Sequence, residues 1–96
     1  MSKNTPGSYD QAVAWFRRSI EVNWNFPHAH FHLASALAHL GRLDEARSAV
    51  KSGLALNPIY TISRDRAVWT GVSDDPTFLA GLELLLDGLR KAGAPE

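Results

Sequence analysis

The side chains best suited to chemistry are four histidines, which all lie in the segment PHAHFHLASALAHLG, residues 27–41. On a helix of about 3.6 residues per turn, His28, His32 and His39 share one face. A zinc site needs at least three protein ligands, but His39 lies roughly 10 Å further along the axis than His32. The helical part of the segment also contains no acidic residue, so we expect no metal site. His30 faces the opposite, apolar side and is expected to pack in the core with one ring nitrogen hydrogen-bonded.

Other catalytic chemistry finds little support in the sequence. The chain has no cysteine and no G-x-S-x-G, P-loop or G-x-G-x-x-G motif. Asp74 and Asp75 precede Pro76, which is typical of a helix start rather than of a pair of catalytic carboxylates. We therefore expect no enzyme activity, no catalytic residues and no cofactor.

Composition narrows the class of protein further. A chain of 96 residues with 45% hydrophobic and 21% charged residues is typical of one small globular domain. Ten basic residues balance ten acidic ones, which argues against a nucleic-acid partner. No apolar run approaches the roughly 20 residues that span a membrane, and the N-terminus lacks the apolar core of a signal peptide. We expect a soluble, cytoplasmic protein.

The elements that must position these residues are all predicted to be helices. Apolar residues recur at helical spacing, and turn signals such as Pro27, Gly41 and Pro58 separate the periodic segments. Residues 59–72 have a divided propensity that favours a helix only weakly. The other expected helices cover residues 8–22, 27–40, 43–57 and a last segment that starts at Pro76 and is capped by Gly93. Residues 1–7 are polar and expected to be disordered.

An internal repeat connects two of these helices. Residues 10–24 align with residues 44–58 at an offset of 34, which pairs Phe16 with Val50 and Asn23 with Asn57. Thirty-four residues is the period of the tetratricopeptide repeat. Residues 27–58 resemble one full repeat of that family, with small residues such as Ala34, Ala46 and Gly53 at positions where helices pack closely.

The resemblance implies antiparallel helical hairpins of tetratricopeptide type, a fragment of an α-solenoid, in a single domain over residues 8–96. Residues 8–24 would be a partial repeat, 27–58 a full repeat and 59–96 a C-terminal cap. The helix over 27–40 would line the concave face, which implies a surface for a peptide or a partner protein. A solvated helix face is an equal alternative, and a pH response of the clustered histidines is a further hypothesis. The predicted lining residues are His28, Phe31, His32, Ser35, Ala38 and His39.

Two further expectations concern the partner. Residues 61–96, with their SDDP turn and GLRKAG ending, resemble the C-terminal tetratricopeptide region of bacterial adenylate or guanylate cyclase-type proteins. The chain could thus be the C-terminal part of such a protein, or a short relative, that regulates a catalytic domain outside this sequence. Alternatively, Trp15, Trp24 and Phe26 could form an exposed apolar surface through which two copies associate as a homodimer.

Overall fold

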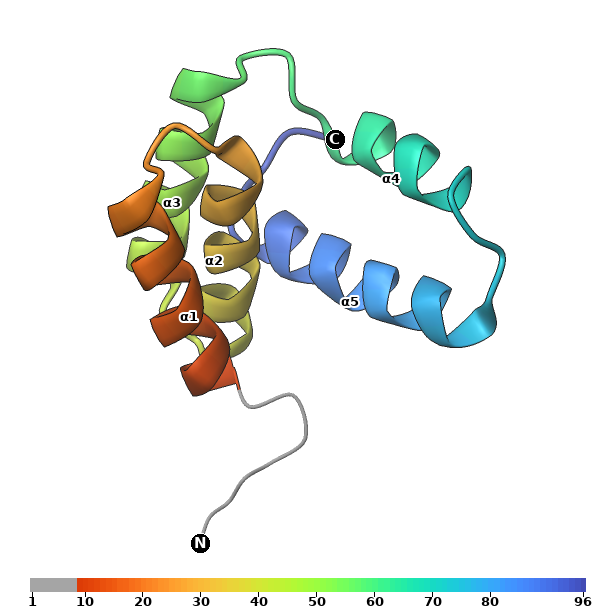
Figure 1. Cartoon of the computed structure of the whole chain (residues 1–96), viewed down its shortest axis with the longest axis horizontal. Coiled ribbons are helices and arrows are strands. Elements are labelled where there is room, and N and C mark those ends of the chain that lie inside the picture. The colour runs from red at the N-terminus through yellow and green to blue at the C-terminus, as the bar shows by residue number, and fades with distance from the viewer. Residues whose placement is uncertain (1–8) are drawn as a thin grey trace, which may run out of the picture.

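The computed structural model describes residues 9–96, and every regular element in that range is a helix (Figure 1). This confirms the all-α prediction, including a helix within residues 59–72. The predicted helix boundaries agree with the observed ones to within about two residues, the usual uncertainty of a helix end. The predicted disorder of residues 1–7 and the predicted start of the first helix at residue 8 lie outside the described residues. The helices are α1 (Tyr9–Val22), α2 (Pro27–His39), α3 (Leu43–Leu56), α4 (Ile62–Thr70) and α5 (Pro76–Lys91).

Local chemistry explains where the helices begin and end. Pro27 is the first residue of α2, where its missing N–H is not needed. Gly41 follows this helix with a φ of 83°, a backbone conformation that glycine adopts without steric penalty. The Asp75 carboxylate accepts a hydrogen bond of 3.0 Å from the Phe78 N–H at the start of α5. The Thr61 hydroxyl accepts a similar bond of 3.1 Å from the Arg64 N–H and thereby caps α4.

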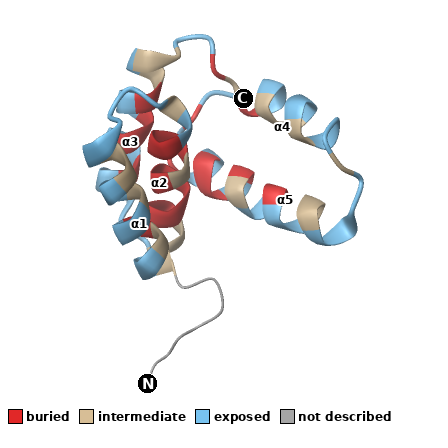
Figure 2. Ribbon diagram, viewed as in Figure 1, coloured by how far each residue is buried: buried red, intermediate tan, exposed pale blue. Residues whose placement is uncertain are grey.

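Helices α1, α2 and α3 pack side by side into a three-helix block with α2 at its centre. Ala34 and Ala46 are fully buried in this block, and such small side chains let helix backbones approach closely. Leu33 and Leu37 of α2 are also buried in this core. Figure 2 shows that burial is concentrated on α2, whereas the outer faces of α1 and α3 are exposed.

Helices α4 and α5 form a hairpin, called the arm here, which extends away from the three-helix block (Figure 1). An ion pair of 2.8 Å joins Arg66 of α4 to Glu83 of α5. The Ile62 N–H donates a hydrogen bond of 2.8 Å to the carbonyl oxygen of Pro95. The last residues of the chain therefore hold the start of α4 in place, and α4 packs on α5 rather than on α3.

The arm is attached to the block where α5 crosses α2. Leu86 and Leu89 of α5 are fully buried, so the apolar stripe of this helix faces the core. The two backbones approach closely at Gly88, because a Cβ atom there would lie 2.7 Å from the Ser35 carbonyl oxygen and 2.8 Å from its Cα. The Ser35 hydroxyl donates a hydrogen bond of 2.9 Å to the Leu85 carbonyl oxygen. A small residue on each helix thus permits the contact.

This contact predicts opposite effects for two glycines of α5. Gly88→Ala should lower the free energy of unfolding by about 1–3 kcal/mol, since the added methyl group overpacks a close backbone contact. Gly81→Ala is the matched control, because a Cβ atom there meets nothing within 4 Å. It should raise stability by about 0.5–1 kcal/mol through helix propensity. Urea denaturation followed by circular dichroism measures both, and equal effects would contradict the proposed packing.

Candidate functional site

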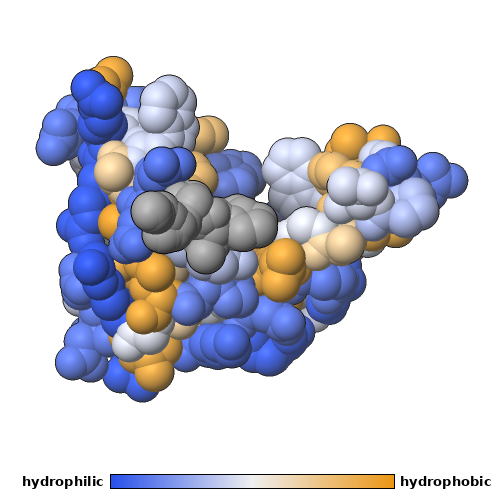
Figure 3. Space-filling view, turned by 90° about the horizontal axis from the view of Figure 1, so that it is seen from below, coloured by the Kyte–Doolittle hydropathy of each residue, from blue (hydrophilic) through white to orange (hydrophobic). Residues whose placement is uncertain are grey.

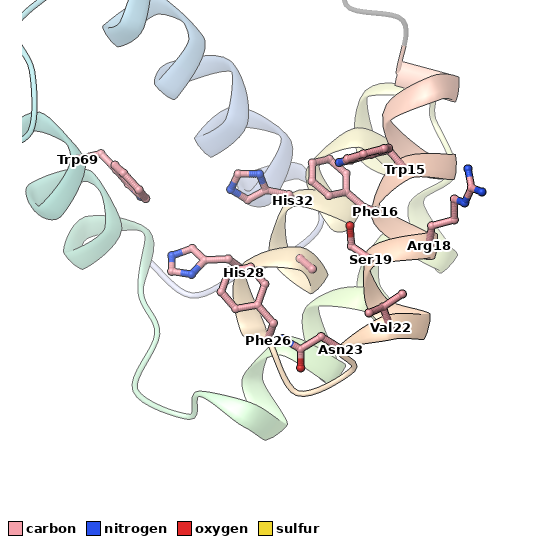
Figure 4. Close-up of a pocket in the computed structure, with 11 residues that line it drawn as sticks. Trp15, Phe16, Arg18, Ser19, Val22, Asn23, Phe26, His28, His32 and Trp69 are labelled. Carbon is pink, nitrogen blue, oxygen red and sulfur yellow. The ribbon is translucent and has the colours of Figure 1, made fainter.

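A groove of about 880 Å³ lies between α1, the first turns of α2, and α4. In the space-filling view, apolar side chains lie on both the three-helix block and the arm, with a hollow between them (Figure 3). Figure 4 shows His28 and His32 between the α1 side chains and Trp69 of α4. The groove is lined by Trp15, Phe16, Arg18, Ser19, Val22, Asn23, Phe26, His28, Ala29, His32 and Trp69.

Two of the predicted site residues, His28 and His32, lie in this groove. Their rings are 6.3 Å apart, edge to face, and His28 is also 6.1 Å from the ring of Trp69. The ring of Phe16 from α1 lies 5.3 Å from that of His32. These spacings are in the range of aromatic pairs, so the floor of the groove is a run of edge-to-face rings rather than a charged surface.

The prediction that all six residues line one open face is wrong, because helix α5 covers the part of that face with Ser35 and His39, and Phe31 is buried on another side of α2. Phe31, Ser35 and Ala38 are 2%, 4% and 5% exposed. His39 is half-buried, and its Nε2 lies 2.8 Å from the Leu84 carbonyl oxygen of α5. The physical reason is that the apolar stripe of α5 is buried by packing against α2, and the small residues of α2 let the two helices approach closely.

Phe31 is directed away from the groove. Its ring stacks on that of Tyr60 at 3.9 Å and lies against Gly53 of α3. The Tyr60 hydroxyl donates a hydrogen bond of 2.8 Å to the Asp65 carboxylate, and burial together with this bond raises the pKa of Tyr60. This hydrogen bond therefore joins the turn before α4 to the first residues of that helix.

The fourth histidine is placed as predicted. His30 is 9% exposed, and its Nε2 lies 2.7 Å from the Trp24 carbonyl oxygen. The ring nitrogen closes the turn between α1 and α2. His30 is thus a structural residue of the core.

Trp69 was missed by sequence reasoning. It belongs to the segment with divided propensity, so its position relative to α2 could not be derived from periodicity. It borders the groove and a second hollow of about 450 Å³ next to α5, and His32 also lines both. Trp69 and His32 therefore connect the two hollows.

The residues predicted for self-association are exposed. Trp15 and Trp24 are each 66% exposed and Phe26 is 48% exposed. Trp15 and Phe26 line the groove, whereas Trp24 lies outside it. Large apolar side chains that remain in water are informative when they gather on one face, as Trp15 and Phe26 do here together with Val22, which is 88% exposed.

Within residues 9–96, no set of three histidine, aspartate or glutamate side chains is placed to hold a metal ion. None of the helices from α1 to α5 is long and apolar enough to cross a membrane.

Comparison with known proteins supports the repeat. Residues 15–48 match the family model of the tetratricopeptide repeat. This match covers most of α1, all of α2 and the start of α3, and supports a tetratricopeptide-type arrangement of these helices. It begins earlier than the predicted full repeat 27–58.

One curated relative has a significant match. An uncharacterized protein of Methanocaldococcus jannaschii is 38% identical over 55 residues. The matched segment is 57% of this chain and 64% of the relative, so it spans less than two thirds of that protein. No solved structure matches the chain significantly.

The surroundings of His32 predict a pH dependence of stability. Burial lowers the pKa of His32 below its ordinary value of 6.5, His28 lowers it further, and Asp65 opposes both effects. Just below pH 6.5 the unfolded chain therefore binds a proton at this residue that the folded chain does not bind. The free energy of unfolding should therefore fall as the pH decreases from about 6.5 toward the lower pKa of His32 in the folded chain. Above pH 6.5 the contribution of His32 to stability is fully present.

Urea denaturation between about pH 5 and 8 tests this dependence. His32→Gln should flatten the slope in this interval. His28→Gln should reduce the slope but leave most of it, since burial is the larger cause. Identical slopes for the wild type and His32→Gln would show that His32 does not titrate as described.

Proposed function

We propose that this protein is an interaction module that binds an apolar segment of a partner protein in the groove between α1, α2 and α4. Tetratricopeptide repeats are generally non-catalytic and commonly bind proteins, and the match over residues 15–48 supports this class. Of the predicted peptide-binding residues, His28 and His32 remain candidates at this site. The observation that carries the proposal is the groove itself, about 880 Å³ and lined mainly by aromatic and aliphatic side chains.

The ring geometry supports an apolar ligand with few polar contacts. The lowered pKa of His32 keeps its imidazole neutral at neutral pH. A neutral ring can donate one hydrogen bond and accept another, so it can fix the register of a bound backbone without requiring a charged ligand. Trp69 and Phe16 supply flat apolar surface on either side of the histidines.

Photo-crosslinking tests the location of the partner. A crosslinking amino acid at position 69 should capture a protein that mass spectrometry can identify, whereas the same group at exposed Lys51 on α3 should not. The purified partner should then bind Trp69→Ala at least about tenfold more weakly than wild type, as expected for a buried aromatic contact. His32→Ala should also weaken binding.

Val68→Ala is the matched control for Trp69→Ala. Val68 is the preceding residue of α4 and is 62% exposed, but it does not line the groove. Binding should be unchanged in this variant. A partner that binds Trp69→Ala, His32→Ala and wild type equally would place the interaction elsewhere on the molecule.

Self-association is a second candidate function, favoured by the exposed rings of Trp15, Trp24 and Phe26. Sedimentation velocity over a range of concentrations should show an increasing sedimentation coefficient if two copies associate through these side chains. A variant with glutamine at all three positions should remain monomeric. A wild-type chain that stays monomeric at the highest concentration would reject this function.

A third candidate is regulation of an adenylate or guanylate cyclase domain outside this sequence. It is supported by the resemblance of residues 61–96 to the C-terminal regions of such proteins. Gene context or a longer transcript that encodes a cyclase domain together with this chain would favour this role over a separate adaptor.

A further inference from the structure

The α1 side of the groove corresponds to a surface that is covered in the next repeat. At the offset of 34 residues, Ala12, Trp15, Phe16 and Ser19 of α1 align with Ala46, Ala49, Val50 and Gly53 of α3. All four of these α3 residues are buried, and α2 packs along this helix. In α1, none of the four equivalent residues is buried, and Trp15 is 66% exposed.

We infer that the α1 side of the groove is a seat for one amphipathic helix of a partner protein, packed on α1 as α2 packs on α3. This inference rests on the proposed interaction function and specifies the shape and charge of the partner segment. A second copy of the chain is a poorer occupant, because its own α2 is already enclosed by α1, α3 and α5. The partner must therefore supply a helix that its own fold leaves accessible.

The side chain at position 19 sets the size of the partner residue above it. In the covered repeat, the Phe31 ring lies over Gly53, and a Cβ atom on Gly53 would be 2.8 Å from that ring. The equivalent residue of α1 is Ser19, which carries a Cβ atom and a hydroxyl. A helix in the α1 seat therefore needs a smaller residue than phenylalanine at the position equivalent to Phe31.

Charge complementarity sets a second feature of the partner. Arg18 is the charged residue that lines the groove, and Figure 4 shows its side chain extending outward from α1. Within residues 9–96, no carboxylate lies within ion-pair distance of Arg18, whereas the adjacent Arg17 pairs with Glu45 at 2.9 Å. The residue equivalent to Arg18 is Ser52, which lines a small hollow together with His30 of α2. An acidic residue at the position equivalent to His30 would therefore lie near Arg18.

Peptides based on α2 test the charge requirement. We would titrate the full chain with synthetic residues 25–41 that carry Phe31→Ala and either His30→Glu or His30→Lys. The Glu peptide should bind about threefold or more tightly than the Lys peptide, as expected for a partly exposed ion pair. Arg18→Gln should abolish this preference, and Arg17→Gln should retain it.

A second cycle tests the size requirement. Two peptides that both carry His30→Glu, one retaining Phe31 and the other with Phe31→Ala, would be compared on wild type and on Ser19→Gly, after circular dichroism shows that this variant is folded. Wild type should prefer the alanine peptide, and Ser19→Gly should shift the preference toward phenylalanine by about fivefold or more, since the ring gains the space that Gly53 provides.

The outcomes separate the inference from the proposed function. A charge preference that survives Arg18→Gln, or a size preference that ignores Ser19→Gly, would overturn the helix seat. Failure of all the peptides to bind would also overturn the helix seat. If the partner still crosslinks at position 69 and binds Trp69→Ala more weakly than wild type, the proposed function stands even though the helix seat is overturned. Binding that depends on both Arg18 and Ser19 would support the seat, even where position 69 gives no crosslink.

Discussion

The close contact between α5 and α2 determines what the rest of the molecule can do. Gly88 lets the α5 backbone reach Ser35, and the Ser35 hydroxyl and His39 ring both bond to carbonyl oxygens of α5. Each such bond contributes about 1 kcal/mol, but their larger effect is to fix where α5 crosses α2. Because α5 carries α4 with it, this crossing also places Trp69 opposite His28 and His32.

The same contact explains why the accessible groove is smaller than the concave face predicted from the sequence. One part of the predicted concave face serves as packing surface for α5, and the part near the start of α2 remains accessible. The chain stabilises its central helix by covering it on three sides, with α1, α3 and α5. The open side between α1 and α4 keeps exposed apolar side chains, namely Trp15, Val22 and Phe26.

Much of the fold could be predicted from residue spacing and capping chemistry. The turn at Gly41, the start of α5 at Pro76 and the inward direction of Leu33 and Leu37 all follow from local rules. The candidate site was predicted less well, because a helical wheel shows which residues share a face but not what covers that face. Ser35 and His39 lie on the predicted arc, but only the three-dimensional path of residues 57–76 brings α5 over them. That path depends on contacts such as Tyr60 with Asp65, which join residues too irregularly spaced for a periodic signal.

The four histidines illustrate how one residue type can serve several purposes on a single helix. Imidazole has a flat apolar ring and a polar nitrogen, so it can pack in a core while satisfying a backbone carbonyl group. His30 and His39 use this property at the two ends of α2, where they bond to Trp24 and Leu84. His28 and His32 lie in the groove, where α1 and α4 supply aromatic neighbours. Their clustering in the sequence therefore reflects a helix that must meet a different neighbour on each side, and it needs no shared metal ion to explain it.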